Sequence, residues 1–569
     1  MYNYIRNEIK RSIENFIGEK IQVDEIQESK IADFSFKTFK IAEKLGKKQD
    51  VLANEISLGV KSLKFIERVS SEGAYVNFFL NYPKTLKEFL KNIRKDKNYG
   101  KGKVKKRKII LEHTSINPSG PIHVGRLRNS LIGDALKRIL NFYGYEVETH
   151  YYVNDIGKQI AIIAQGFADD IKYDNEISKK YKCYENKEDF QIFFEYVVAN
   201  KKFQEDLKFQ QKVQDLIKSA ESGNREALEK IKEVAKKCLV GQKKTLDKLN
   251  IKFDSFDFES KFIENGSVEK ILKKLKDNEF AVENELGFGL NLEKFGLKRR
   301  DAITVLARKD GTSVYLTRDL CYHLEKARLG DEMLNILGED HKFEFLELKC
   351  ILENFLKLRK PLRVVHFSFV NFEGEELSTR KGLILAVDKL IDEAIEKAKN
   401  EIKKRGIASE EIAPIIGIGA IKYHILKTSP QKQITFRWED ALNFDGETGP
   451  YIQYAHARCC SLLKKFSADI GKIKIDSICT ELSDEEKSLL KKLIKFPYIV
   501  ENSVNELKPN ILASYLYELS SEFSRFYKKC QVLGVEKGIS ERRILLVDAT
   551  RIVIKKGLEL LGIDAPERM

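Results

Sequence analysis

The stretch from Ile109 to Gln159 constrains the fold most, because it predicts a complete strand–loop–helix–strand unit. A short apolar strand at residues 109–111 enters a loop rich in proline and glycine, and apolar residues at helical spacing follow over 127–140. Gly144 ends this helix, and residues 146–153 then alternate between apolar and polar types, as a strand does. Ligands of such parallel units bind beyond the carboxyl ends of the strands. We therefore expect an α/β domain with a ligand site at that edge.

Polar side chains gather at the carboxyl ends of both predicted strands. They are Glu112, His113, Ser115, Asn117 and His123 at the first end, and Asn154 and Asp155 at the second. Gly125 lets the backbone approach a ligand at a helix N-terminus, where free N–H groups favour anions. His123 can donate a hydrogen bond to a phosphate, although a histidine before a helix is also often bonded to nearby backbone. This edge therefore predicts a nucleotide site.

Length and composition narrow the class of protein. A chain of 569 residues is too long for one core, so several domains are expected. It contains no apolar run approaching the roughly 18 residues of a membrane helix, and its N-terminus lacks a signal-peptide core, so we expect a cytoplasmic protein. The cysteines lack zinc-ligand spacing, so no metal site is predicted. The net charge of +15 favours a polyanionic partner, although lysine-rich codon usage would give the same excess.

The chain divides into three predicted domains. Residues 1–100 form a small α/β module, with helical patterns at Tyr4–Ile17 and Phe39–Leu58. Residues 101–388 hold the strand–helix unit and, over about 171–252, a charged helical insertion without strand signals. Residues 389–569 are helical almost throughout, which predicts an all-α C-terminal domain.

Two further segments carry charged side chains that could bind a ligand. Residues 375–382 read EELSTRKG, a glycine-closed loop whose cations can neutralise a triphosphate, unless it is an ordinary surface turn. Tyr315 and Asp319 stand four residues apart, so one helical turn places them on one face. A carboxylate beside a phenol can bind a planar guanidinium in two-pronged fashion, while a core tyrosine next to a surface charge is the alternative.

These motifs together resemble one family. The loop at 121–126 reads PIHVGR, similar to the HIGH signature of class I aminoacyl-tRNA synthetases, and LSTRKG at 377–382 is similar to their KMSKS loop. The resemblance narrows to arginyl-tRNA synthetases through HTSINPSGPIHVGRLRNSLIGDAL, YYVNDIGKQ, SVYLTRD, GEDH, FDGETGPYIQYAHARCCSLL and the terminal APERM. It covers residues 73–569 in the family's order. It implies a Rossmann-like parallel-sheet catalytic domain with a helical insertion, between a small N-terminal α/β domain and an all-α anticodon-binding domain.

The resemblance implies where ATP would bind. The implied residues are His123, Gly125, Arg126, Gly338, Asp340, His341 and Ser378. The segment from His366 to Val370 would approach the adenine, and Mg²⁺ is expected with ATP. His123, Arg380 and Lys381 would be the catalytic groups that stabilise charge on the phosphates. Arg126 stands where most members have the second histidine of HIGH, so whether it takes over that role is open.

The arginine pocket is implied in the same way. Its residues would be Glu112, Ser115, Asn117, Tyr315 and Asp319, with Asn154 and Asp155 lining the same cavity. A substrate guanidinium requires a pocket carboxylate, and Asp319 would supply it.

The second signature departs from the family. Thr379 occupies the position of the catalytic lysine, and Glu376 that of the first lysine. Some members that lack this lysine carry one just before the HIGH proline, where this chain has Gly120. Arg380 and Lys381 remain as joint candidates for stabilising the departing pyrophosphate.

The C-terminal helices would bind the anticodon, and the N-terminal module would touch the D-loop of the tRNA. The implied tRNA-binding residues are Tyr451, Gln453, Tyr454, His456 and Arg458, which combine stacking surfaces with base-reading groups, although packing between helices is their alternative role. A tRNA(Arg) partner would account for the basic charge. The family resemblance implies a monomer.

The predicted function is ATP-dependent ligation of L-arginine to tRNA(Arg) through arginyl-adenylate, with tRNA bound before activation. Two alternatives are another class I synthetase, such as the cysteinyl enzyme, and a non-catalytic tRNA-binding paralogue. Tyr315 and Asp319 oppose the first. The altered second signature supports the paralogue, whereas His123, Gly125 and Asp319 oppose it.

Overall fold

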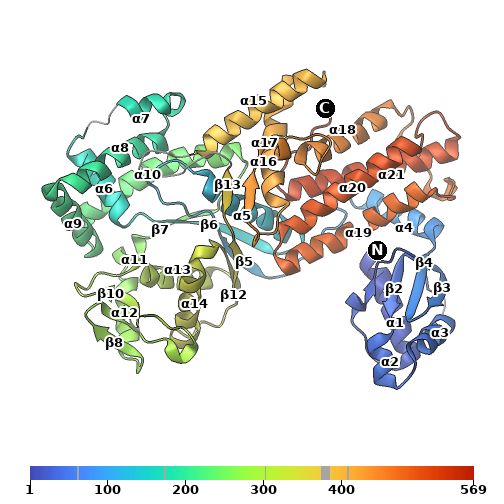
Figure 1. Cartoon of the computed structure of the whole chain (residues 1–569), viewed down its shortest axis with the longest axis horizontal. Coiled ribbons are helices and arrows are strands. Elements are labelled where there is room, and N and C mark those ends of the chain that lie inside the picture. The colour runs from blue at the N-terminus through green and yellow to red at the C-terminus, as the bar shows by residue number, and fades with distance from the viewer. Residues whose placement is uncertain (61–62, 172–174, 301–302, 373–384, 407–408) are drawn as a thin grey trace.

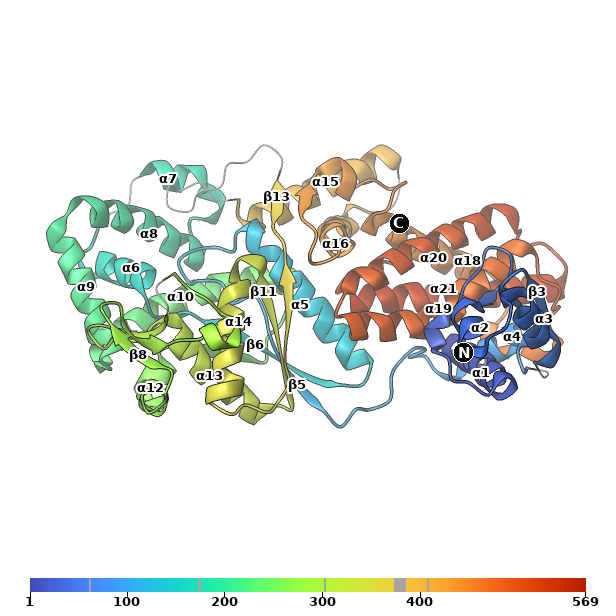
Figure 2. The ribbon, with the colours of Figure 1, turned by 60° about the horizontal axis from the view of Figure 1, so that its bottom comes forward.

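A computed structural model describes residues 1–60, 63–171, 175–300, 303–372, 385–406 and 409–569. A parallel sheet lies at the centre, with the helical insertion on one side and the C-terminal helices on the other (Figure 1). The N-terminal domain lies against the C-terminal helices, and the chain then runs back to the sheet through an extended linker (Figure 2). Among the described helices, none combines the length and apolar character needed to cross a membrane.

The N-terminal domain is a four-stranded antiparallel sheet with helices, in strand order β1-β2-β4-β3. Its elements are α1 (Tyr2–Ile17), β1 (Ile26–Gln27), β2 (Phe34–Lys37), α2 (Phe39–Leu45), α3 (Gln49–Gly59), β3 (Ile66–Glu72), β4 (Tyr75–Leu80) and α4 (Tyr82–Lys95). The helical pattern predicted over 39–58 is two helices, because Gly46 adopts a φ of 63° and ends α2 with a left-handed cap.

The central sheet confirms the predicted α/β unit. Its strands are β5 (Lys108–Glu112), β6 (Glu146–Val153), β7 (Ser255–Phe258), β11 (Glu332–Gly338) and β12 (Leu362–Phe367). They are all parallel, in the order β12-β11-β5-β6-β7, and α5 (Val124–Phe142) connects β5 to β6. Because the strands are parallel, their carboxyl ends lie along one edge.

Two insertions extend this sheet. The first is helical, as predicted, and consists of α6 (Lys158–Ala168), α7 (Asn175–Lys180), α8 (Glu188–Glu205), α9 (Leu207–Glu221) and α10 (Arg225–Lys248). The second contains α11 (Lys261–Glu264), α12 (Ser267–Lys276), β8 (Ala281–Asn284), β9 (Gly287–Leu290) and β10 (Thr304–Arg308), and its strands form a small antiparallel sheet. The helices α13 (Tyr315–Leu329) and α14 (Lys342–Cys350) follow and flank β11 in sequence.

The C-terminal part is helical apart from one short strand. Its elements are α15 (Val387–Arg405), α16 (Ala413–Leu426), β14 (Ile434–Phe436), α17 (Trp438–Ala441), α18 (Gly449–Lys465), α19 (Asp484–Glu506), α20 (Pro509–Lys529) and α21 (Lys537–Leu560). The strand β14 pairs in parallel with β13 (Val370–Phe372), which follows the central sheet. At the start of α19, Ser483 and Glu486 form a capping box that fixes where this helix begins.

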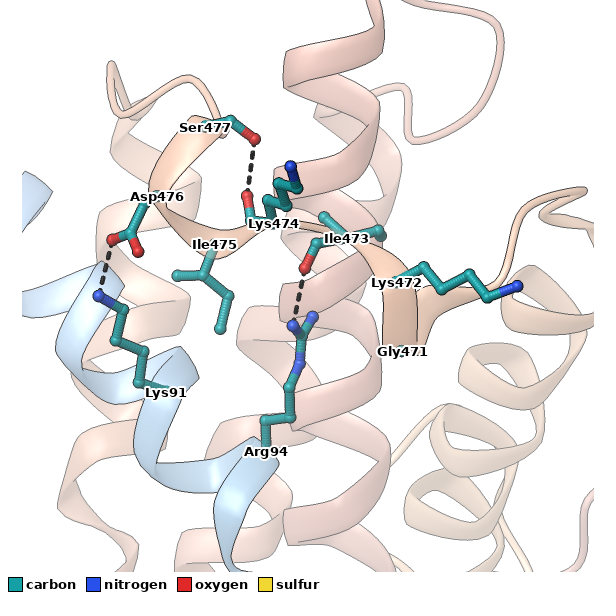
Figure 3. Close-up of a pocket in the computed structure, with 9 residues that line it drawn as sticks. All are labelled: Lys91, Arg94, Gly471, Lys472, Ile473, Lys474, Ile475, Asp476 and Ser477. Atoms are coloured by element: carbon teal, nitrogen blue, oxygen red, sulfur yellow. Dashed lines mark hydrogen bonds and ion pairs between the residues drawn. The ribbon is translucent and has the colours of Figure 1, made fainter.

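A pocket of about 640 Å³ marks the junction between the N-terminal domain and the C-terminal helices. It lies between α4 and residues 470–477 (Figure 3). Lys91 Nζ lies 2.6 Å from Asp476 Oδ1, and Arg94 donates to the carbonyl oxygen of Ile473 at 2.7 Å. Since both cations bind groups of the opposite wall, the pocket is a contact between domains, and it lies outside the ligand-binding edge of the sheet.

Candidate functional site

The loop after β5 is held in an unusual conformation at the carboxyl edge of the sheet. Thr114 and Ser115 have φ values of 72° and 42°, the left-handed region that non-glycine residues rarely adopt. The Thr114 amide donates to Asn129 Oδ1 at 2.9 Å, and its hydroxyl donates to Ser130 at 2.9 Å, so α5 fixes this turn. Ser115 Oγ then accepts from the Tyr152 amide at 3.1 Å. Backbone strain of this kind, stabilised by neighbouring groups, is typical of binding sites.

Helix α13 begins at Tyr315, so Tyr315 and Asp319 lie one turn apart, as predicted. Tyr315 is 52% exposed, and the side chain of Asp319 is 37% exposed. Asp319 Oδ1 lies 2.9 Å from His323 Nδ1. Burial alone would raise the pKa of Asp319, but His323, Lys326 and His341 together lower it below the usual aspartate value. Asp319 is therefore an ionised, accessible carboxylate.

A buried polar network occupies the space behind Asp319. Lys326 is fully buried, and its ammonium group donates to Glu112 Oε2 and lies 3.1 Å from His323 Nε2. Asn335 also donates to Glu112 Oε2, at 3.0 Å. Glu112, predicted in the arginine pocket, thus already has a cation. His323 and Lys326 were not predicted from the sequence, although they follow Asp319 by four and seven residues, respectively, on the same helical face.

A second carboxylate, Glu259, follows the end of β7 and also has its own cation. The Arg318 guanidinium donates to Glu259, and both side chains are 1% exposed. Burial raises the pKa of Glu259 to about 7, although Arg318 opposes this shift. Arg318 also lies 5.0 Å from the centre of the Tyr315 ring, which fixes one side of the tyrosine. Within the described part of the chain, His323 is the ion-pair partner of Asp319, so neither a lysine nor an arginine neutralises it directly.

The asparagines of the predicted pocket lie close to one another, whereas Asp155 does not face a cavity. Asn117 is exposed and donates to Gln159 Oε1 at 3.2 Å, and its side chain lies 3.5 Å from that of Asn154. The Asn154 amide nitrogen donates to Glu259 Oε2 at 2.6 Å. Asp155 is fully buried and accepts from the Ser260 amide at 2.9 Å. This bond joins the ends of β6 and β7, so Asp155 stabilises the edge of the sheet. We expected Asp155 to line the cavity, and this expectation was wrong.

His123 is the N-cap of α5, in the loop that follows β5 at the carboxyl edge of the sheet. Its neighbours Ile122 and Val124 are hydrogen-bonded to the backbone of residues 385–387. Burial and the adjacent Arg126 lower the pKa of His123 to about 4, so the imidazole is neutral at physiological pH. A Cβ added at Gly125 would lie 3.1 Å from this ring, so a larger residue at position 125 would crowd the imidazole. Arg126, only partly buried, keeps a positive charge at the same helix end.

Arg128, on α5, connects this helix to the other segments that were predicted to bind ATP, residues 338–341 and 366–370. It is fully buried and donates to the carbonyl oxygens of Ser368 at 2.7 Å and Ser429 at 2.8 Å. The Ser368 hydroxyl in turn donates to Glu339 Oε2 at 2.8 Å. Residues 338–341 and 366–370 therefore meet beside α5. Sequence reasoning did not identify Arg128, because its partners are backbone atoms distant along the chain.

Predicted nucleotide contacts lie on these joined segments. Gly338 ends β11 and pairs with Phe367, and the side chains of Asp340 and His341 are 44% and 48% exposed. Asp340 Oδ2 lies 3.6 Å from His341 Nε2. His341 also lowers the pKa of Asp319, so residues 338–341 lie near Asp319 at the carboxyl edge of the sheet.

Three family models match the chain in sequence order. They are "Arginyl tRNA synthetase N terminal domain" at residues 3–80, "tRNA synthetases class I (R), catalytic domain" at 88–438 and "DALR anticodon binding domain" at 452–569. The second alone covers more than half of the chain. The chain belongs to the arginyl-tRNA synthetase family.

Relatives of this synthetase agree over the whole length. Arginine–tRNA ligases of Methanocaldococcus jannaschii and Methanosphaera stadtmanae are each 39% identical to it, over 99% and 100% of both chains. Its structure is similar to the Thermus thermophilus arginyl-tRNA synthetase, with a TM-score of 0.81 and 25% identity over 99% of this chain and 100% of that one. The Plasmodium falciparum enzyme shares the fold, with a TM-score of 0.77 and 19% identity over 100% and 98% of the two chains. The protein is thus a class I arginine–tRNA ligase that uses ATP.

The anticodon-binding helix α18 of this synthetase uses some of the predicted tRNA contacts for its own packing. Gln453 and His456 are fully buried. Gln453 donates to the carbonyl oxygen of Asp564 at 2.9 Å, and His456 Nδ1 lies 2.9 Å from that of Pro566. Both therefore hold the C-terminal segment instead of facing a partner, which corrects the prediction for these two side chains.

The remaining predicted side chains of α18 are partly exposed. They are Tyr451, Tyr454 and Arg458. Tyr451 donates to the Ser524 hydroxyl at 3.1 Å, and the Arg458 guanidinium lies 4.6 Å from the centre of the Tyr454 ring.

The second signature of this synthetase lies outside the described residues, including Ser378, Arg380 and Lys381. The structure does describe Gly120, where some family members were expected to carry the compensating lysine. Its φ is 157°, and an added Cβ would lie 3.0 Å from Phe193 Cβ. Its carbonyl oxygen accepts from Gln242 at 2.8 Å. A side chain at this position would therefore crowd the helical insertion.

Proposed function

We propose that the carboxyl edge of the parallel sheet is the site where this synthetase forms arginyl-adenylate and then charges tRNA(Arg). The observation that carries the assignment is Asp319. Glu112 and Glu259 each have a buried cation, whereas Asp319 is ionised and accessible beside the exposed Tyr315. Asp319 therefore keeps a negative charge that a ligand could bind. A guanidinium would satisfy it with two parallel N–H donors.

The other arginine contacts follow from this orientation. Tyr315 would bind the guanidinium alongside Asp319, because both face outward from the first turn of α13. Ser115 and Asn117 lie on the β5 side and would bind the polar end of the amino acid. Glu112 would act mainly through the charge and position of the Lys326 network that surrounds it.

ATP would bind across the start of α5. The neutral His123 imidazole would donate to a phosphate oxygen, and Arg126 would add positive charge. The remaining ATP contacts would be Gly125, Gly338, Asp340, His341 and Ser378. Arg380 and Lys381 would stabilise the leaving pyrophosphate, and Mg²⁺ would enter bound to the phosphates of ATP.

The reaction has two displacements. A carboxylate oxygen of arginine attacks the α-phosphorus of ATP, and the bond from that phosphorus to pyrophosphate breaks. The 2′-hydroxyl of the terminal tRNA ribose then attacks the carbonyl carbon of the adenylate, and AMP leaves with the bonding electrons. The protein contributes positioning and charge stabilisation, because neither step needs a covalent enzyme intermediate.

The tRNA would span the three domains. Tyr451, Tyr454 and Arg458 would contact the anticodon, since aromatic rings stack on unpaired bases. Residues 1–100 would touch the D-loop, while 101–388 would hold the catalytic site and 389–569 the anticodon site. We propose a cytoplasmic monomer that activates arginine only after tRNA has bound.

Pyrophosphate exchange tests this assignment. We expect exchange with arginine alone among the twenty amino acids, and only when tRNA is present. His123→Ala should lower the exchange rate about 100-fold at saturating arginine, because it removes a donor aimed at developing charge. Exchange without tRNA would contradict the order of binding. An unchanged rate in the His123 variant would contradict the placement of ATP.

A further inference from the structure

A buried ionic cluster joins the helical insertion to the start of α15. We call it the insertion clamp, and it consists of Lys187, Asp189, Thr245 and Asp388. Lys187 Nζ lies 2.9 Å from both Asp189 Oδ2 and Asp388 Oδ2, and 2.7 Å from Thr245 Oγ1. The Thr245 hydroxyl donates to Asp388 Oδ2 at 2.9 Å. Both aspartate side chains are fully buried, so their common counter-ion is the Lys187 ammonium group.

The segment that Asp388 anchors is bonded to both sides of His123. The Val124 amide donates to the Leu385 carbonyl oxygen at 3.0 Å, and the Val387 amide donates to that of Ile122 at 2.8 Å. These two bonds form an isolated antiparallel bridge between His123 and Ala386. The position of the His123 backbone thus depends directly on residues 385–388.

Apolar packing reinforces the same connection. Ala386 is fully buried in a cluster with Tyr181, Phe190, Phe193 and Phe194, all from the helical insertion. The Lys187 ammonium group also lies 5.5 Å from the centre of the Phe190 ring. A single lysine at the start of α8 therefore stands between two carboxylates on one side and this aromatic cluster on the other.

We propose that Lys187 is a positioning residue for adenylate formation, acting through Asp388 and the 385–388 segment on His123. This proposal rests on the proposed role of His123 in binding ATP. Without the ammonium group, the two buried carboxylates would lose their common counter-ion, and Asp388 would keep the more distant Lys248 at 3.6 Å. A buried ion pair broken in this way is strongly unfavourable. Asp388 would move away from Asp189. The two backbone bonds that hold residues 122–124 would then open.

The test compares Lys187→Met with Lys248→Met. Lys248 also lies near Asp388, at 3.6 Å from Oδ1, but its side chain is 46% exposed, so its loss should be neutral. For Lys187→Met we expect the exchange rate per arginine-binding site to fall about 10- to 100-fold, the cost of a small misplacement of a reacting group. The KM for arginine should change less than about threefold, because the clamp does not touch Asp319. Counting binding sites by equilibrium dialysis separates this effect from loss of folded protein.

Hydrogen–deuterium exchange gives a direct structural readout. The amides of Val124 and Val387 should exchange faster in Lys187→Met and unchanged in Lys248→Met. The double variant Lys187→Met/Asp189→Asn removes the uncompensated charge and should fold normally. Its pyrophosphate exchange rate should stay low, since Asp388 still lacks its ion pair with Lys187.

Two results would overturn the proposal. One is a wild-type rate in Lys187→Met. The other is full recovery in the double variant, which would mean that Lys187 only neutralises charge. A failure of the proposed function looks different, because the wild-type protein itself would then not exchange pyrophosphate with arginine.

Discussion

Replacing Asp319 by asparagine removes a carboxylate whose ion-pair partner, among the described residues, is His323. The substitution keeps the shape of the side chain and a hydrogen-bonding group next to His323. Hydrogen bonds to a charged group contribute about 1.5–3 kcal/mol, and exposure of 37% places Asp319 in the lower half of that range. A loss of about 1.5–2.2 kcal/mol corresponds to about 10- to 40-fold weaker arginine binding. We therefore expect the KM for arginine to rise by this factor.

The assay is tRNA-dependent pyrophosphate exchange with arginine as the varied substrate. The KM for ATP should stay within about twofold, because Asp319 acts on the guanidinium and not on the triphosphate. Glu325→Gln is the matched control. Glu325 lies on the same helix but pairs with Lys261 at 2.6 Å, so its loss should leave both KM values unchanged. Since the pKa of Asp319 is lowered, the effect should be constant between about pH 6 and 8.

The reasoning fails if Asp319→Asn raises the KM for arginine less than about threefold while the protein remains folded. It also fails if the KM for ATP rises by the same factor, because the carboxylate would then affect the site as a whole. A large effect of Glu325→Gln on either KM would show that α13 is sensitive to the loss of any charge. The rise in the KM for arginine in Asp319→Asn could then not be assigned to a contact with the guanidinium.

Three other predictions concern packing, tRNA binding and pH. Gly120→Lys should lower the melting temperature without raising the exchange rate, because its Cβ would meet Phe193; a faster exchange rate would contradict this. Arg458→Ala should raise the KM for tRNA several-fold with unchanged stability, whereas Gln453→Ala should lower the melting temperature, since it removes a fully buried side chain that donates to the carbonyl oxygen of residue 564. Burial lowers the pKa of His150, but neighbouring carboxylates raise it overall, so its stabilising effect is present below about pH 6.5 and disappears as the pH rises through the raised pKa. The difference in melting temperature between wild type and His150→Gln should therefore shrink from pH 5.5 to 8.5, and a growing difference would contradict it.

Local periodicity predicted much of the architecture. The strand–helix–strand unit at 109–153, the helical insertion and the C-terminal helices all have patterns that depend on residues close in sequence. The same holds for Tyr315 and Asp319, whose spacing alone indicates a shared helical face. Parallel strands then bring separate segments to one edge, so the position of the site followed from the fold class.

Contacts between distant residues were beyond this reasoning. Glu112 looks like a free pocket carboxylate in the sequence, but Lys326 pairs with it across 214 positions. Gln453 and His456 look like base-reading groups on an aromatic helix, but the last residues of the chain return and bind both. In each case a polar side chain had two physically reasonable roles. Only the three-dimensional arrangement distinguishes a partner within the protein from a partner outside it.

The helical insertion stabilises the HIGH-like loop through two separate attachments, one just before the loop and one within it. From α10, Gln242 donates to the carbonyl oxygen of Gly120, just before the loop. From the start of α8, Lys187 binds Asp388, whose segment is bonded to Ile122 and Val124. A lysine at position 120 would disturb the first attachment. The arrangement that lets the insertion pack against this loop is therefore the same one that would crowd a compensating lysine there. In the proposed ATP site, the positive charge for the triphosphate would then come from elsewhere in the chain.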